Sequence, residues 1–124
     1  MTEPQANFYR WQDLESEQLS PKVARRVIMA DRVTLARFDL EAGALIARHA
    51  HGHEQLTYIE AGRLRLWLGE DDAQVHELAA GDVLHIPSQL PHRAEAIEAT
   101  RATDVFCPRR EDWLAATDTH VGGR

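Results

Sequence analysis

The chain has 124 residues, of which 20 are acidic and 14 basic, and its formal net charge of −6 argues against a general nucleic-acid partner. Hydrophobic residues make up 44% of the sequence, which excludes a disordered chain and suits a single domain, residues 1–124, with a modest core. No apolar run approaches the roughly 18 residues of a membrane helix, and the N-terminus lacks the basic and apolar regions of a signal peptide, so we expect no membrane partner.

Short apolar runs separated by turn residues dominate the chain, and they predict an all-β sandwich or barrel. Residues 1–22 are expected to form an N-terminal extension or edge strand. The strands expected after it are, in chain order, Val23–Ala30, Val33–Leu40, Gln55–Glu60, Arg63–Leu68, Val75–Leu78, Val83–Ile86, His92–Ala96 and Thr103–Phe106.

One strand carries a clean alternation of apolar and polar residues. Because side chains alternate faces along a strand, the segment Arg63–Leu68 should bury its three leucines, Leu64, Leu66 and Leu68. After Pro108 the segment Glu111–Ala116 predicts a short terminal helix, and residues 118–124 are expected to be a frayed tail.

Four side chains suited to metal binding form the most informative pattern. His49, His51 and Gln55 have odd numbers, so they face the same side if they lie on one extended strand. His92 begins a later strand that can return toward the first. Neutral imidazoles are the commonest protein metal ligands, and an amide oxygen can complete such a set. The pattern predicts a site for one divalent transition metal ion, either Ni, Zn, Fe or Mn, in which Gln55 is either a ligand or the hydrogen-bond partner of one.

The neutrality of this ligand set bears on its chemistry. An ion held by three imidazoles and an amide keeps nearly its full positive charge, and the set lacks the two-histidine, one-carboxylate triad of many non-haem iron oxygenases. The composition therefore favours Lewis-acid chemistry, in which the metal polarises a substrate oxygen.

A second group of functional residues follows near the C-terminus. Asp104 and Phe106 share parity on a predicted strand, so both face the interior if one does. Arg110 lies just beyond, and its planar guanidinium suits a carboxylate. A small organic acid is therefore the expected partner. Each residue also has a purely structural explanation. Asp104 could form an ion pair with an arginine, Phe106 could be a core residue, and Arg110 could belong to the charged start of a helix.

The spacing of these residues resembles the two motifs of the cupins. The first, G-x5-H-x-H-x3-E-x6-G, matches Gly43, His49, His51, Gln55 and Gly62, and the second, G-x5-P-x-G-x2-H-x3-N, matches Gly81, Pro87 and His92. Gln55 replaces the usual glutamate, Gln89 the usual glycine and Ala96 the usual asparagine. The resemblance implies a double-stranded β-helix, the cupin jelly-roll barrel, with a metal in its mouth.

Two further segments narrow the resemblance. H-E-Q-x-T-Y at His53–Tyr58 and D-V-F-x-P-x-R-E-D at Asp104–Asp112 resemble the small cupins of pectin and alginate breakdown that linearise unsaturated uronates. The resemblance implies an isomerase- or lyase-type enzyme that converts a cyclic 4,5-unsaturated monouronate into its open-chain keto form. It implies that His49, His51, Gln55 and His92 hold the metal, whereas Asp104 relays a proton, Arg110 grips the carboxylate and Phe106 contacts the substrate.

Two other functions fit the same residues: a three-histidine iron dioxygenase or lyase, and a non-catalytic metal-containing cupin that binds a small molecule. The aromatic segment Phe8–Trp11 is expected to lie on the sheet of a second copy, as in other small cupins, which gives a homodimer. We expect His53 at a bend or behind the ligands and His85 in the core. The single cysteine, Cys107, excludes an intrachain disulfide and fits a cytoplasmic location.

Overall fold

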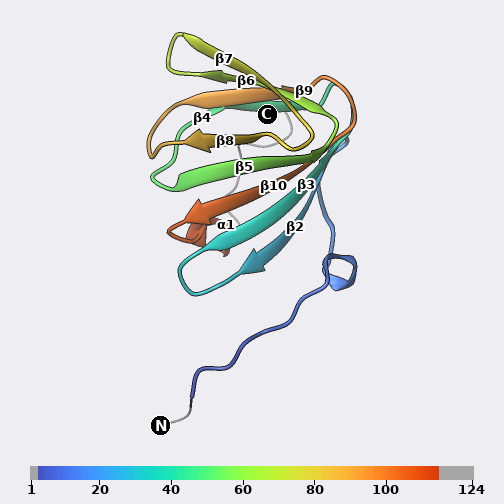
Figure 1. The fold of residues 1–124 in the computed structure, drawn as a ribbon, viewed down its shortest axis with the longest axis vertical. Coiled ribbons are helices and arrows are strands. Elements are labelled where there is room, and N and C mark those ends of the chain that lie inside the picture. The colour runs from blue at the N-terminus through green and yellow to red at the C-terminus, as the bar shows by residue number, and fades with distance from the viewer. Residues whose placement is uncertain (1–2, 115–124) are drawn as a thin grey trace.

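The computed structural model describes residues 3–114 of the chain, and in this part β-strands predominate (Figure 1). A 3-10 helix, η1 (Trp11–Asp13), precedes the strands, and a short helix, α1 (Glu111–Leu114), follows them. The strands are β1 (Glu17–Ser20), β2 (Val23–Met29), β3 (Thr34–Leu40), β4 (Leu45–His49), β5 (Glu54–Ala61), β6 (Arg63–Leu68), β7 (Gln74–Ala79), β8 (Val83–Ile86), β9 (His92–Ala96) and β10 (Thr100–Cys107).

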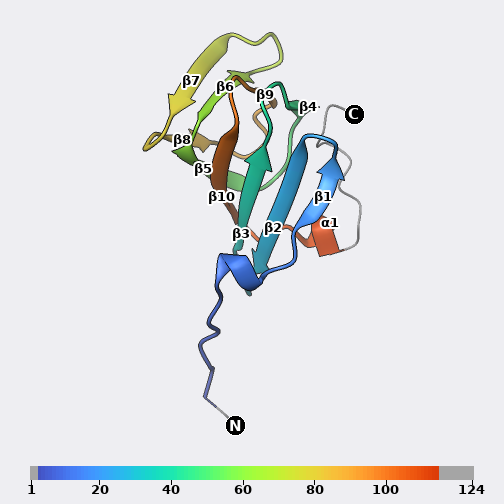
Figure 2. The ribbon, with the colours of Figure 1, turned by 90° about the vertical axis from the view of Figure 1, so that its right-hand side faces the viewer.

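The strands form two antiparallel sheets that face each other. The larger sheet has the order β1-β2-β3-β10-β5-β8, and the smaller has the order β4-β9-β6-β7 (Figures 1 and 2). Neighbours in the sheets are often distant in sequence, since β10 lies between β3 and β5 and β9 lies between β4 and β6. The prediction of an all-β jelly-roll barrel with a short C-terminal helix is confirmed.

The core fills the space between the sheets and follows the period of two. Along β3 and β10 every second residue is buried, and along β6 the three leucines Leu64, Leu66 and Leu68 are 5%, 3% and 2% exposed, as predicted. Burying a leucine side chain stabilises the fold by about 1.5–3 kcal/mol. The same alternation directs polar side chains inward at one end of the barrel, where β5, β9 and β10 carry Gln55, His92 and Asp104.

The structure corrects two expectations near the histidines. The segment from His49 to Gln55 is not one strand, because β4 ends at His49, β5 begins at Glu54, and the two strands belong to different sheets. Their connection contains Gly52 and is held by hydrogen bonds from the segment that precedes β9. His85 is not a core residue: its side chain is exposed and lies 2.7 Å from the carboxylate of Glu54.

Other boundaries differ by a few residues. Strand β4 was not expected, and β10 is longer than the predicted Thr103–Phe106 because its pairing with β3 begins at Thr100. The C-terminal helix starts at Glu111 as predicted, whereas Ala115, Ala116 and the predicted frayed tail lie outside the described residues.

Two tight turns near the barrel rim need left-handed backbone. Gly62 has φ +90°, and a Cβ there would lie 2.2 Å from the carbonyl oxygen of Ala99, so only glycine fits between β5 and β6. Gln89, which stands where the second cupin motif has glycine, has φ +68°. Its backbone N–H donates to the carbonyl oxygen of His51 at 2.8 Å, so this strained residue anchors the β4–β5 connection.

The N-terminal part extends away from the barrel. Strand β1 forms one edge of the larger sheet, and residues 3–10 lead from it as an arm (Figures 1 and 2). Phe8 and Tyr9 on this arm are 76% and 47% exposed. Neither helix in residues 3–114 is long and apolar enough to cross a membrane.

Candidate functional site

Three imidazoles converge at one end of the barrel. His49 closes β4 and His92 opens β9, and the two are direct partners in the antiparallel pairing of these strands. His51 comes from the β4–β5 connection. The ring centroids lie 4.3 Å apart for His49 and His92, 5.5 Å for His49 and His51, and 5.1 Å for His51 and His92. One ligand nitrogen from each ring lies within 4.8 Å of the other two, so the cluster can hold a metal ion.

Backbone carbonyl groups fix the orientation of all three rings. In each ring, Nδ1 lies within hydrogen-bonding distance of the carbonyl oxygen of a residue two positions away. The acceptors are Ala47 for His49, His53 for His51 and Leu90 for His92, at 2.8, 3.0 and 2.8 Å. A ring that donates from Nδ1 carries its lone pair on Nε2. This tautomer, assigned from the hydrogen bonds, is the one that metal-binding histidines use when their second nitrogen is held by a carbonyl group.

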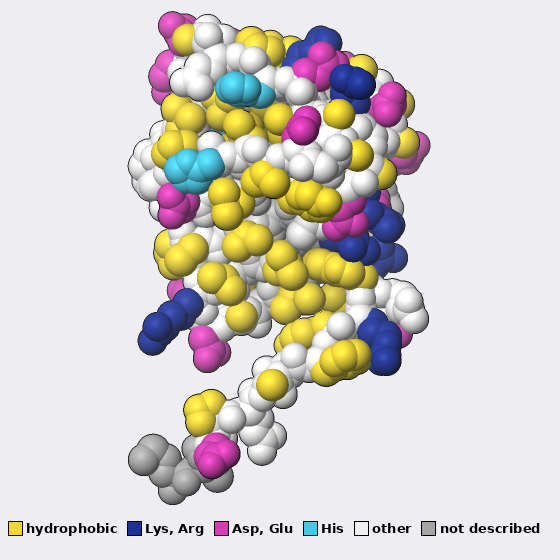
Figure 3. Space-filling model, in the orientation of Figure 1, with side chains coloured by type: hydrophobic (Ala, Val, Ile, Leu, Met, Phe, Trp, Pro, Cys, Tyr) yellow, Lys and Arg dark blue, Asp and Glu magenta, His cyan; other side chains and the backbone are white. Residues whose placement is uncertain are grey.

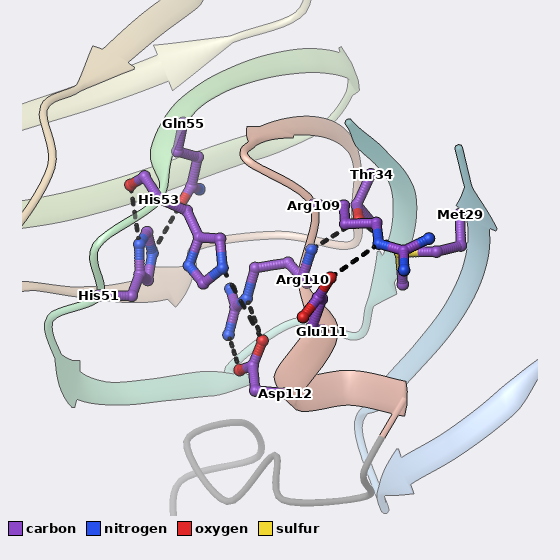
Figure 4. Close-up of polar contacts among 9 residues, drawn as sticks. All are labelled: Met29, Thr34, His51, His53, Gln55, Arg109, Arg110, Glu111 and Asp112. Carbon is purple, nitrogen blue, oxygen red and sulfur yellow. Dashed lines mark hydrogen bonds and ion pairs between the residues drawn. The ribbon is translucent and has the colours of Figure 1, made fainter. Parts of the chain in front are cut away.

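Gln55 completes the cluster from β5. Its amide nitrogen donates to the Thr57 hydroxyl at 2.9 Å, which turns the amide oxygen toward His51. That oxygen lies 3.1 Å from His51 Nε2, so two electron-pair donors face each other (Figure 4). A cation between them would satisfy both atoms, and this donor set therefore fits a divalent transition metal.

The burial of His51 keeps its ring neutral. Desolvation, with smaller contributions from Arg110 and His92, lowers the pKa of His51 from 6.5 to about 4. A neutral imidazole is the form that binds metal, so the ring needs no deprotonation at pH 7.

A buried carboxyl group lies next to this cluster in the sheet. Asp104 on β10 pairs in register with Thr57 on β5, and it is 8% exposed. Burial raises the pKa of Asp104 from 3.8 to about 7, while a hydrogen bond with Thr57 and the charge of Arg110 oppose the shift. Thr57 thus links the amide of Gln55 to a carboxyl group that is near half-protonation at neutral pH.

Arg110 is buried beside Phe106, and its guanidinium forms an ion pair with the carboxylate of Asp112. Its guanidinium is bound at Nε and Nη2 by the two oxygens of Asp112, at 3.0 and 2.7 Å (Figure 4). It also lies over the rings of Phe106 and Trp113, at 4.9 and 4.4 Å from their centroids. The residue is 2% exposed, and its backbone N–H donates to the Thr34 hydroxyl. The structural partner of Arg110 is therefore Asp112 rather than Asp104.

These groups share one small cavity of about 70 Å³ inside the barrel. Apolar side chains from both sheets form much of its wall, and the polar lining gathers at the end that holds the histidines. The lining includes His49, Gln55, His92, Asp104, Phe106 and Arg110. Residues predicted from two separate sequence motifs thus face the same volume.

Three residues that line or support the site were assigned no role from the sequence, although Thr57 and Asp112 lie within the two quoted segments. Thr57 shares parity with Gln55 on β5, which was a usable signal. Asp112 stands two positions after Arg110, but only the folded turn shows that it pairs with it. Trp113 packs edge-on against Phe106 with 5.2 Å between ring centroids, a contact that the sequence pattern does not reveal. His53, which we expected at a bend or behind the ligands, has its ring 5.4 Å from that of the ligand candidate His51.

The two antiparallel sheets and the three imidazoles at one end place this protein among the small β-barrel proteins whose interior can hold a metal ion. The chain belongs to the cupin family, because the family model described as "Cupin domain" matches residues 36–106. A relative from Streptomyces coelicolor, the uncharacterized protein SCO3923, is 26% identical over 102 residues, which cover 81% of this chain and 94% of the relative.

Solved structures show the same fold. KdgF from a Halomonas species superimposes with a TM-score of 0.80 at 24% identity, covering 87% of this chain and 100% of KdgF. An RmlC-like cupin from Shewanella frigidimarina gives a TM-score of 0.79 at 24% identity, covering 88% and 96%. Oxalate decarboxylase from Bacillus subtilis gives 0.74 at 19% identity, covering 86% of this chain but 31% of the enzyme. A further study of that decarboxylase concerns its Mn(II) centres.

Asp104 predicts a pH dependence of stability. Since its pKa is higher in the folded state, the folded protein takes up a proton between about pH 4 and 7 that the unfolded chain does not. The contribution of Asp104 to the free energy of unfolding is therefore fully present at low pH and is lost as the pH rises through 7. The loss is of the order of a few kcal/mol. Asp104→Asn should flatten the profile. Urea unfolding of wild type and variant at pH 5 and pH 8, with a chelator present, measures the difference, and equal pH dependence in both would contradict it.

Proposed function

We propose that this chain is a metal-dependent cupin enzyme that acts on a small sugar acid, opening the ring of 4,5-unsaturated monouronates to give the keto form. The observation that carries the proposal is the shared cavity, which two of the three clustered imidazoles line together with a buried guanidinium and a buried carboxyl group of raised pKa. The likeness to KdgF agrees with the resemblance seen in the segments His53–Tyr58 and Asp104–Asp112.

Arg110 would bind the substrate carboxylate. Asp112 engages Nε and Nη2 of the guanidinium, so the donors on Nη1 are not used by Asp112 and can bind a second carboxylate. Phe106 and Trp113 stack against the guanidinium and limit its movement. The clamp is therefore preorganised, which lowers the entropic cost of binding.

Asp104 would transfer the proton. Linearisation is an isomerisation: the C1 hydroxyl loses a proton, the bond between C1 and the ring oxygen breaks, and C4 gains a proton as the enol becomes a ketone. No oxidant or reductant is needed. A carboxyl group with a pKa of about 7 can both accept and donate a proton near neutral pH, which suits this exchange.

His49, His51, His92 and Gln55 would hold one divalent transition metal, Ni, Zn, Fe or Mn. When bound, such an ion supplies Lewis-acid polarisation of a substrate oxygen. The remaining work falls to the chain itself: the Nδ1 hydrogen bonds orient the imidazoles, and the apolar cavity wall excludes water around the sugar ring.

Metal binding should require the imidazole cluster. Protein purified without a chelator or nickel column should contain close to one ion per chain, and the double variant His51→Ala, His92→Ala should contain almost none, because two ligands are lost. Elemental analysis measures the content. His85→Ala is the matched control, since His85 is exposed, pairs with Glu54 and is not one of the ligand candidates. Full metal content in the double variant would sink the proposed ligand set.

The roles of Arg110 and Asp104 predict selective losses in turnover. Arg110→Ala should lower kcat/KM about 100-fold through loss of the carboxylate clamp. Asp104→Asn keeps the shape but removes the proton relay, which is worth roughly 10²–10⁴-fold. Loss of the ultraviolet absorbance of the 4,5 double bond follows the reaction, with the spontaneous rate subtracted.

Arg109→Ala is the control, because Arg109 pairs with Glu111 on the surface and should leave the rate near wild type. If the metal-loaded wild type adds nothing to the spontaneous rate with either pectin- or alginate-derived monouronates, the uronate assignment is wrong. Ligand binding without turnover would favour a non-catalytic cupin, and oxygen consumption with Fe(II) would favour a dioxygenase. If the wild type is active and both variants match it, the assigned residue roles are wrong.

We also propose that two copies assemble through the outer face of the larger sheet. Hydrophobic side chains gather over this face (Figure 3), and Leu56, Tyr58 and Val83 on β5 and β8 are 44%, 43% and 58% exposed. The exposed aromatic residues of the N-terminal arm, Phe8 and Tyr9, are suited to cover such a surface on a second copy.

Light scattering at micromolar concentration should give twice the chain mass of 14.0 kDa. Val83→Asp should shift the protein toward monomer, because it places a charge in the apolar face. Val75→Asp is the control, since Val75 is 53% exposed on β7 of the other sheet. A monomeric wild type would contradict the proposal.

A further inference from the structure

An aspartate outside the cavity links β4 and β9, the two strands that carry the ligand candidates His49 and His92. Asp72 lies in the β6–β7 connection, and its carboxylate is held by Arg48 and Arg93. Arg93 donates from Nε and Nη2 to one carboxylate oxygen, at 3.2 and 3.0 Å, and Arg48 donates to the other. Arg48 directly precedes His49 on β4, and Arg93 directly follows His92 on β9.

The geometry of the strands places this bridge behind the imidazoles. Because neighbouring residues on a strand face opposite sides, the arginines lie on the outer face while His49 and His92 turn inward. The two histidines are paired across β4 and β9, but the regular pairing shifts between Ile46 and His49. At this irregular end the backbone ladder fixes the register less firmly, so side chains on the outer face contribute more to it.

Further contacts tie the same connection to both strands. Arg48 also donates to the carbonyl oxygen of Gly69, and the Gly69 N–H donates to the carbonyl oxygen of Pro91 at 2.8 Å, next to His92. The guanidinium of Arg93 lies 3.9 Å from the centroid of the Trp67 ring. The Asp72 side chain is 26% exposed, so its two ion pairs form a partly shielded network rather than an isolated surface pair.

We propose that Asp72 is a positioning residue for the metal centre: by holding Arg48 and Arg93 together, it fixes the separation of His49 and His92. The inference rests on the proposed metal site. The β6–β7 connection contributes no ligand candidate, but under this proposal it controls how tightly the site holds an ion. Groups that orient ligands typically change metal affinity 10–100-fold. Asp72 acts through neighbouring residues, so the expected effect is at the lower end, about tenfold.

A second aspartate in the chain serves as a control, because its ion pairs stabilise the fold without adjoining a ligand candidate. Asp39 on β3 is also held between two arginines, with Arg101 at 2.7 Å and Arg26 at 3.4 Å, and its side chain is 37% exposed. This second network lies on the outer face of the larger sheet and borders none of the ligand candidates. Loss of either aspartate removes a similar set of ion pairs, but only the partners of Asp72 directly adjoin ligand candidates in the sequence.

Asp72→Asn is the test variant. Asp72 has φ +56°, a conformation that asparagine tolerates, so the substitution removes the charge and keeps the turn. Zn²⁺ affinity, measured by competition with a chelator, should fall about tenfold in Asp72→Asn and stay within twofold of wild type in Asp39→Asn. The visible absorption of bound Co²⁺ should change in the first variant only, because it reports ligand geometry. Urea unfolding of the metal-free proteins should show similar losses of stability in both.

Unchanged Zn²⁺ affinity in Asp72→Asn, or an equal loss in Asp39→Asn, would overturn the positioning role. If wild type itself takes up no metal, the proposed function fails, and hydrogen exchange of the metal-free protein then decides the inference. Asp72→Asn should accelerate amide exchange at the ends of β4 and β9 that carry His49 and His92, and Asp39→Asn should not. Equal exchange there in wild type and Asp72→Asn would refute it.

Discussion

The register between β10 and β5 determines which side chains can meet in the cavity. Asp104 lies opposite Thr57 and Phe106 lies opposite Gln55, so a buried carboxyl group and a ligand candidate are neighbours on one inner face. A slip of β10 by one residue relative to β5 would turn Asp104 and Phe106 to the outside of the barrel, while Thr57 and Gln55 stayed inside. Since β10 also pairs with β3 along its length, the centre of the larger sheet holds this register from both sides.

The polar end of the interior is stable because its groups compensate one another. An isolated buried charge is costly, but Arg110 has both oxygens of Asp112, and His51 avoids a charge because burial lowers its pKa to about 4. Asp104 is less well compensated, because its Oδ1 is one of the buried polar atoms of the described residues that have no hydrogen-bond partner. An unsatisfied carboxyl oxygen aimed at a cavity is more consistent with use by a ligand than with a purely structural role.

The sequence predicted the features that depend on local periodicity or on motif spacing. Alternation in Arg63–Leu68 is a local property, so the burial of its leucines could be predicted without the fold. The parity argument predicted that the side chains of His49, His51 and Gln55 lie close together, and they do. Its premise was wrong, because it assumed one strand where the chain changes sheets around Gly52. The grip of Asp112 on Arg110 depends on the turn into α1, and the Asp72 bridge joins residues more than twenty positions apart, so neither is visible in a linear pattern.

The pairing of Arg110 with Asp112 also affects how a ligand would arrive. A guanidinium that is already matched by a carboxylate acts at a distance as a dipole, and the field of a dipole decays faster than that of a single charge. The chain as a whole carries a formal charge of −6, so at long range it repels anions. Neither the net charge of the chain nor the paired Arg110 would therefore steer an anionic sugar toward the barrel. Any electrostatic attraction would come from an ion held by the histidines, because its positive charge would be the largest in the site.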